Sequence, residues 1–93
     1  MIISFADKMT KTIFEAGGHR KIASDVAARA VERLDQLDAA VRVEDMRFPP
    51  GNRLEKLSGN RAGRWSVRVN KQYRITFGWD GENAVDVLLE DYH

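Results

Sequence analysis

The chain has 93 residues, of which 43% are hydrophobic and 31% are charged, and it contains no cysteine. This length predicts one domain over residues 1–93, because there is no room for a second independent core. The lack of cysteine excludes disulfides and thiolate sites, and no apolar run is long enough for a signal peptide or a membrane span. With two histidines and scattered acids, we expect no metal ion, and we expect no other cofactor. The absence of cysteine is compatible with a reducing compartment, and we expect a cytoplasmic protein without a membrane partner.

The net charge of +1 conceals a separation of charge along the chain. Between Arg47 and Thr76 there are eight basic residues and a single acid, Glu55, so this segment carries +7. Residues 77–93 contain five acids and no base, and so carry −5. One basic surface in a nearly neutral protein predicts an anionic partner at one place. The alternative is an ordinary solvated strand face, which would usually carry both signs of charge.

In the first half of the chain, residues 1–5 predict an edge strand and two helices follow. The first helix is predicted over residues 8–16, capped by Asp7 or Thr10 and ended by Gly17-Gly18. This glycine pair lacks the lysine and hydroxyl residue of a phosphate loop. Ser24 is the expected N-cap of a longer amphipathic helix that runs to about Ala40. Its apolar stripe is expected to cover a sheet, while the rest of its surface is polar (Arg29, Glu32, Arg33, Asp35, Asp38).

The second half is predicted to form the sheet. The prolines in residues 48–52 favour a rigid crossover without regular structure, and Arg53–Leu57 is the candidate first strand. After the turn at 58–63, Trp65, Val67 and Val69 alternate with polar residues, as do Tyr73, Ile75 and Phe77 after the connection at 70–72. One face of this hairpin is therefore apolar and is expected to hold Trp65 and Tyr73 in the core.

The opposite face of the hairpin presents Arg64, Arg68 and Arg74 with no acid close in the sequence. A last strand is predicted with Val85, Val87 and Leu89 pointing inward. We expect an α+β fold of order β-α-α-β-β-β, with two N-terminal helices packed on a small, mostly antiparallel sheet.

The side chains available suit cleavage of RNA without a metal ion. In that reaction the 2′-hydroxyl of the substrate is the nucleophile, and the protein supplies a base, an acid and cations for the phosphate. Arginine suits the cationic role because its planar fork pairs with phosphate oxygens. Tyr92, His93 or the terminal carboxylate could move the protons. The alternatives are a frayed terminal histidine, a Tyr92 that packs on the sheet, and a Trp79 whose place is undecided between core and base stacking.

The run PPGNRLEKLSGNRAGRWSVRVNKQYRITF, followed by a final EDYH, resembles the HigB branch of the RelE/ParE toxin superfamily over essentially the whole chain. The resemblance implies a RelE-like fold and a type II toxin that cleaves mRNA in the ribosomal A site by 2′-hydroxyl attack. It also implies a HigA-like helix-turn-helix antitoxin as partner, besides the ribosome and mRNA, with operator DNA contacted only through the antitoxin.

Arg74 matches the family's arginine in the second hairpin strand, and Tyr92 and His93 match its C-terminal pair. Glu55 and Ser58 stand where some members have a histidine and a lysine, which leaves the general base open. The alternatives are a ParE-like toxin that binds DNA gyrase and a non-catalytic RNA-binding module. The expected catalytic residues are Arg64, Arg68, Arg74, Tyr92 and His93, and the expected RNA or ribosome contacts are Arg53, Lys56, Asn60, Arg61, Asn70 and Lys71.

Overall fold

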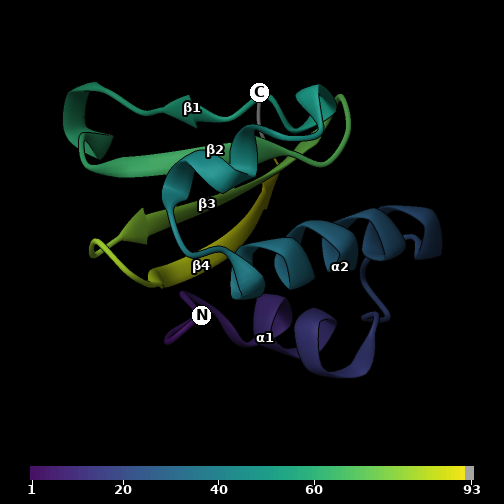
Figure 1. Ribbon diagram of the computed structural model, residues 1–93. Coiled ribbons are helices and arrows are strands. Elements are labelled where there is room, and N and C mark those ends of the chain that lie inside the picture. The colour runs from purple at the N-terminus through teal and green to yellow at the C-terminus, as the bar shows by residue number, and fades with distance from the viewer. Residues whose placement is uncertain (92–93) are drawn as a thin grey trace.

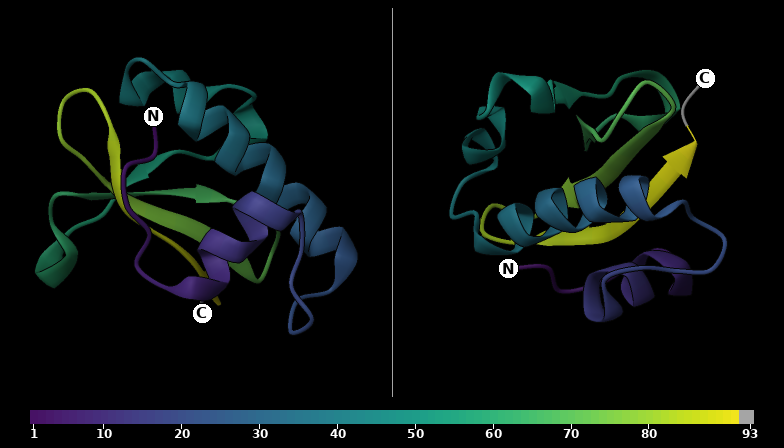
Figure 2. Two further views of the ribbon diagram at one scale, coloured as in Figure 1. Left: turned by 90° about the horizontal axis from the view of Figure 1, so that it is seen from below. Right: turned by 90° about the vertical axis from the view of Figure 1, so that its right-hand side faces the viewer.

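Two helices pack on one side of a four-stranded antiparallel sheet in the computed structural model, which describes residues 1–91 (Figures 1 and 2). Tyr92 and His93 lie outside the described residues. Neighbouring strands in the sheet follow chain order. This confirms the predicted α+β fold. The expected order counts three strands after the helices, whereas the structure has four, and β1 lies within the segment Arg53–Leu57 that was predicted as a candidate strand. The elements are α1 (Lys8–Ala16), α2 (Ser24–Ala39), β1 (Glu55–Lys56), β2 (Arg64–Arg68), β3 (Tyr73–Trp79) and β4 (Ala84–Asp91).

The N-terminal segment runs along the free edge of β4 and forms less of a strand than predicted. Ile2 and Phe5 make isolated parallel bridges to Ala84 and Val87. The chain then turns into α1, where the Asp7 carboxylate accepts a hydrogen bond from the backbone N–H of Thr10 at 2.8 Å. The predicted cap is therefore confirmed. None of the helices within residues 1–91 has the length and apolar character needed to cross a membrane.

The ends of the helices agree with the sequence pattern except at one cap. Gly17 ends α1 in the left-handed conformation, with φ of 84°, which glycine adopts without the penalty that a Cβ would bring. The N-cap of α2 is Ala23, without a side-chain hydrogen bond, and Ser24 is the first helical residue. The prediction of Ser24 as N-cap was wrong by one residue.

The core lies between the helices and the inner face of the sheet. Trp65 and Tyr73 are partly buried and pack against it, as predicted, and Trp79 joins them. The core therefore draws on both halves of the chain, which fixes α2 against the sheet. Its fully buried members are Ile13, Ala30, Leu34, Leu37, Met46, Val67, Ile75, Phe77, Ala84 and Val87.

The prediction that Val85 points inward was wrong, because β4 contains a bulge. Val85 lies opposite Gly78 whereas Leu88 lies opposite Thr76, so β4 has one extra residue between these pairs. Asp86 absorbs it with a positive φ of 49°. As a result Val85 is half-buried on the outer face, while Val87 remains in the core.

The crossover between the two halves contains a turn of 3₁₀ helix, η2 (Pro50–Asn52), where no regular structure was predicted. Buried Asn52 holds this turn to α2, because its amide nitrogen donates to Gln36 Oε1 at 2.9 Å and to the carbonyl oxygen of Met46 at 3.1 Å. Arg53 follows with a left-handed φ of 46°. The extended backbone therefore begins later than predicted, and β1 comprises two residues rather than Arg53–Leu57.

Candidate functional site

A cleft with a volume of about 620 Å³ lies between α2 and the turn that joins β2 to β3. Helix α2 and the crossover form one side, and the turn forms the other. Five of the lining side chains are cationic and none is acidic. We call this hollow the basic cleft; it is lined by Arg29, Arg33, Gly51, Arg53, Arg68, Val69, Asn70, Lys71 and Gln72.

Asn70 builds the turn that forms one wall of the basic cleft. Its side-chain oxygen accepts hydrogen bonds from the backbone N–H groups of Gln72 at 2.8 Å and Tyr73 at 2.7 Å. The Nε of Arg68 donates to the carbonyl oxygen of Asn70 at 3.1 Å. An asparagine that bonds the backbone two residues on is typical of such turns. Asn70 therefore shapes the wall on which Arg68 and Lys71 stand.

Arg74 lies directly opposite Arg68 in the sheet, next to the basic cleft. Its side chain is only 7% exposed. The Nε donates to Ser66 Oγ at 2.8 Å, and a terminal nitrogen donates to the carbonyl oxygen of Arg53 at 2.8 Å. Arg74 shares the face of Arg64 and Arg68, as predicted, but its guanidinium is buried. It ties the crossover to the sheet at the point where Arg53 enters the cleft wall.

A second polar cluster occupies the same face and corrects the expectation of an acid-free surface. Glu90 lies opposite Arg74 and forms an ion pair with Arg61, with an Nη1–Oε1 distance of 3.2 Å, and it also accepts a hydrogen bond from Thr76. Partial burial acts to raise the pKa of Glu90. The hydrogen bonds from Arg61 and Thr76 and the nearby arginine charges outweigh burial, so the pKa lies below its ordinary value.

Arg64 belongs to this second cluster rather than to the basic cleft. Its terminal nitrogen donates to the carbonyl oxygen of Asp86 at 2.7 Å and to Thr76 Oγ1 at 3.4 Å. Four residues of strand separate Arg64 from Arg68, which is about 13 Å. The three arginines predicted to meet one phosphate therefore divide into two places on the face.

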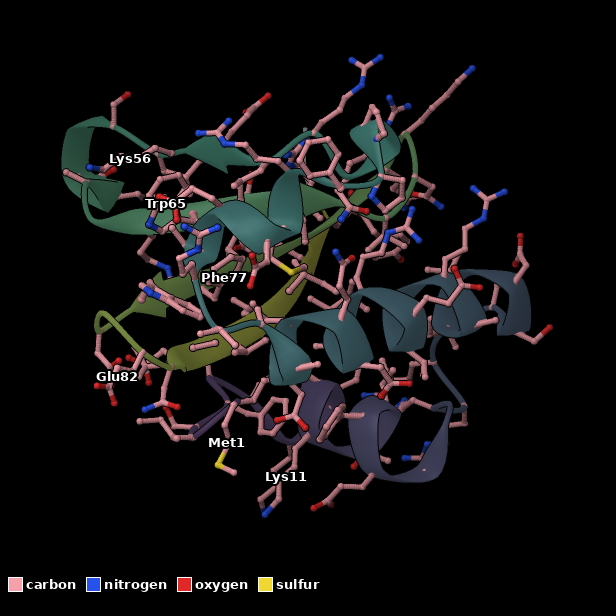
Figure 3. The ribbon with its side chains drawn as sticks, in the orientation of Figure 1. Met1, Lys11, Lys56, Trp65, Phe77 and Glu82 are labelled. Carbon is pink, nitrogen blue, oxygen red and sulfur yellow. The ribbon has the colours of Figure 1, made fainter. Side chains whose placement is uncertain are left out.

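The structure brings only some of the predicted contact residues together. Arg53, Asn70 and Lys71 meet in the basic cleft with Arg68, which is predicted to be catalytic. Lys56 lies over the ring of Trp65, 5.5 Å from its centroid, on the far edge of the sheet (Figure 3), and Asn60 is exposed on the 3₁₀ turn Gly59–Arg61.

The described chain ends beside the basic cleft. Asp91 pairs with Tyr73 across the sheet, and its carboxylate accepts a hydrogen bond from the side chain of Gln72 at 3.0 Å. The end of β4 thus reaches the same end of the sheet as the β2–β3 turn (Figure 1). Tyr92 and His93, the predicted proton carriers, lie outside the described residues. Among residues 1–91, no three histidine, aspartate or glutamate side chains are grouped so that they could hold a metal ion.

Arg29 and Arg33 were not among the predicted site residues, although they form one wall of the cleft. The amphipathic pattern of the sequence places both on the polar side of the helix. Their spacing of four residues places them side by side on one helix face, and this was the signal available in the sequence. It could not show that the β2–β3 turn would come to lie opposite them.

Comparisons with known proteins give consistent matches over the whole chain. Residues 3–93 match a family model described as the RelE-like toxin of the type II toxin-antitoxin system HigB. The chain is 41% identical to Toxin HigB-1 of Vibrio cholerae over 93 residues, covering 99% of this chain and 98% of the relative. It is 33% identical to Endoribonuclease HigB of Proteus vulgaris, with full coverage of both.

Solved structures support the fold. The YoeB dimer from Staphylococcus aureus superposes with a TM-score of 0.64 at 17% identity, covering 99% of this chain and 97% of that one. A chain of a YoeB–YefM complex from the same organism gives a TM-score of 0.59 at 16% identity, covering 100% of this chain and 98% of that one. At these identities the likeness concerns the fold alone.

Proposed function

Because the chain belongs to the HigB-like toxins of type II toxin–antitoxin systems, we propose that it is an endoribonuclease that cleaves mRNA in the ribosomal A site. The Proteus vulgaris relative, matched over its full length, is named an endoribonuclease. The cleavage would proceed by attack of the substrate's own 2′-hydroxyl, without a metal ion, and would stop translation.

The observation that carries this proposal is the basic cleft next to the end of β4. It gathers five cations with no acid in its lining, and the last described residue is hydrogen-bonded to Gln72 in the cleft wall. A phosphodiester held there would lie near Asp91, the last described residue before Tyr92 and His93. Arginine and lysine side chains are the groups that bind phosphate oxygens most strongly.

The proposed chemistry divides between the cleft and the terminus. The 2′-oxygen attacks phosphorus and the bond to the 5′-oxygen breaks, so the products are a 2′,3′-cyclic phosphate and a 5′-hydroxyl. One proton leaves the 2′-hydroxyl and one joins the 5′-oxygen, and His93 and Tyr92 are the proposed carriers. Arg68 and Lys71 neutralise the charge that accumulates on the phosphate.

The geometry refines the roles proposed for the other arginines. Buried Arg74 adds positive charge beneath the phosphate and positions Arg53 through its backbone carbonyl. Arg64 and Arg61, held by Asp86 and Glu90, are proposed to contact the ribosome or the message rather than the scissile phosphate, together with Lys56 and Asn60.

The proposed partners follow from family membership. A HigA-like helix-turn-helix antitoxin would hold the toxin inactive in the cytoplasm, and operator DNA would be contacted only through that antitoxin. A structure of this fold has been solved as a YoeB–YefM complex from Staphylococcus aureus, so the fold is compatible with a bound partner chain.

The test is primer extension on a defined message in purified translating ribosomes. The expected result is new 5′ ends within codons in the A site when the protein is added, and none when ribosomes are omitted. An intact message in cells that still stop growing would reject cleavage. DNA-damage signalling would then indicate the gyrase alternative, and salt-dependent RNA binding without growth arrest would indicate a non-catalytic module.

A further inference from the structure

Arg29 and Arg33 line the part of the basic cleft that is formed by helix α2 rather than by the strands and their turn. They stand one turn apart on α2, on the same face of the helix. The side chain of Arg33 is 17% exposed, and its Nε donates to the carbonyl oxygen of Arg68 at 3.2 Å. This bond fixes the guanidinium of Arg33 against the strand that carries Arg68.

The charges of this wall are poorly balanced by the protein itself. Like charges four residues apart on a helix repel each other, and Arg53, Arg68 and Lys71 line the same cleft. Glu32 is the acid that contacts Arg33, at 3.3 Å, but its side chain is 72% exposed. An exposed ion pair of this kind contributes little. The arrangement is therefore suited to an anion from outside.

We propose that Arg29 and Arg33 extend the basic cleft into a track for the phosphodiester backbone of single-stranded RNA. The strand would pass over α2 and reach the phosphate site formed by Arg68 and Lys71. This inference rests on the proposed function and assigns α2 a part in holding the substrate.

The size and position of the cleft favour an RNA strand over a lone anion. A volume of about 620 Å³ is in the range of pockets that hold drug-sized ligands, so it exceeds the needs of one phosphate. The cleft also extends from α2 to the β2–β3 turn. Asp91, the last described residue, accepts a hydrogen bond from Gln72 in that turn. A nucleotide chain with a phosphate at every unit can occupy both walls at once.

The test measures binding separately from cleavage. Full-length protein is titrated into a fluorescent single-stranded RNA whose 2′-hydroxyls are methylated, so that it cannot be cleaved by 2′-hydroxyl attack, at several salt concentrations. Arg29→Gln is expected to weaken binding about threefold to tenfold and to reduce the slope of log K against log salt by about 0.7. Arg29→Lys is expected to restore most of the affinity, because the charge returns.

Lys11→Gln is the matched control, since it also removes one positive charge. Lys11 is exposed on α1 and belongs to a separate groove along residues 2–11; Figure 3 shows it pointing away from the sheet. Its substitution is expected to leave both affinity and salt slope unchanged. Arg33→Lys, which keeps the charge but cannot reproduce the bond to Arg68, is expected to weaken binding less than Arg29→Gln.

If Arg29→Gln bound the methylated RNA with wild-type affinity and a wild-type slope of log K against log salt, the proposed RNA track would be overturned. Loss of antitoxin binding in Arg29→Gln, with RNA binding unchanged, would also overturn it and would make an acidic antitoxin segment the occupant. The proposed function fails separately, when the wild-type protein binds the methylated RNA but leaves the ribosomal message intact.

Discussion

Arg74 combines a structural position with a proposed role at the phosphate. Arg74→Ala removes donors to Ser66 Oγ and to the Arg53 carbonyl from a site that is 7% exposed. Because these acceptors lose a charged donor, the free energy of unfolding is expected to fall by about 1.5–3 kcal/mol, measured by urea denaturation. Lys71→Ala, at an exposed position, is the control and is expected to change stability by less than about 0.5 kcal/mol.

Toxicity of Arg74→Ala must therefore be measured at a temperature where its circular dichroism spectrum is that of the folded protein. Under that condition we expect toxicity to be lost. Wild-type toxicity in the folded variant would remove Arg74 from the site and leave it a structural residue.

Glu90 predicts a defined pH dependence. Its folded pKa lies below the ordinary value of 4.5, since the bonds from Arg61 and Thr76 outweigh burial. A lowered pKa means that the ionised group stabilises the fold above the unfolded pKa, and that this contribution disappears as pH falls through the folded pKa. At pH 7 the free energy of unfolding of Glu90→Gln is expected to be up to about 1 kcal/mol below that of wild type, a modest difference because the ion pair is partly exposed. Near pH 2 the two proteins are expected to differ by almost nothing.

The measurement is the free energy of unfolding of wild type and variant from pH 7 to pH 2. Glu82→Gln, in the exposed turn after β3, serves as the control and is expected to match wild type throughout. A Glu90→Gln difference that stays constant with pH would contradict the role of the ionised carboxylate.

At the scale of the element, the bulge in β4 depends on a glycine in the neighbouring strand. A Cβ added to Gly78 would lie 2.8 Å from Cγ2 of Val85. Gly78→Ala is therefore expected to reduce the free energy of unfolding by about 1–3 kcal/mol. Adding Val85→Ala removes the clash, so the double variant should be more stable than the sum of the two single effects predicts.

Gly18→Ala is the control for this cycle, because a Cβ there meets nothing within 4 Å. It is expected to leave stability unchanged or slightly raised. Strict additivity of Gly78→Ala and Val85→Ala in thermal or urea unfolding would show that the close approach does not shape the bulge.

The sequence predicts correctly those elements whose signals lie within their own segment of the chain. The helices, the central hairpin and the Asp7 cap follow from periodicity and from residue types with known preferences. The bulge at Asp86 does not, because Val85 fits a regular alternation, and its position opposite Gly78 is set by the pairing of β4 with β3. The short β1 likewise reflects the left-handed Arg53, whose carbonyl is held by Arg74 from another strand.

At the scale of the whole molecule, the parts of the site that depend on local sequence were predicted, and the parts that depend on packing between distant segments were not. The charge of residues 47–76 indicated Arg53, Arg68 and Lys71, which meet in the basic cleft. The helical wall depends on how α2 packs against the sheet, so Arg29 and Arg33 could not be assigned to the cleft from their own segment. The acid of the second cluster comes from β4, far along the chain from Arg61.

The cleft cations and the proposed proton carrier come from different parts of the sequence, so binding and chemistry can be tested independently. The residues that line the cleft all fall between Arg29 and Gln72 in the sequence, whereas His93 is the proposed proton carrier. His93→Gln is expected to reduce the rate of message cleavage on ribosomes by about 10²–10⁴, the usual contribution of a general acid or base. Its affinity for the 2′-O-methylated RNA should remain that of wild type. His19→Gln, which replaces the other histidine of the chain, is expected to keep both properties. Unimpaired cleavage by His93→Gln would assign the proton transfer to Tyr92 or to another group.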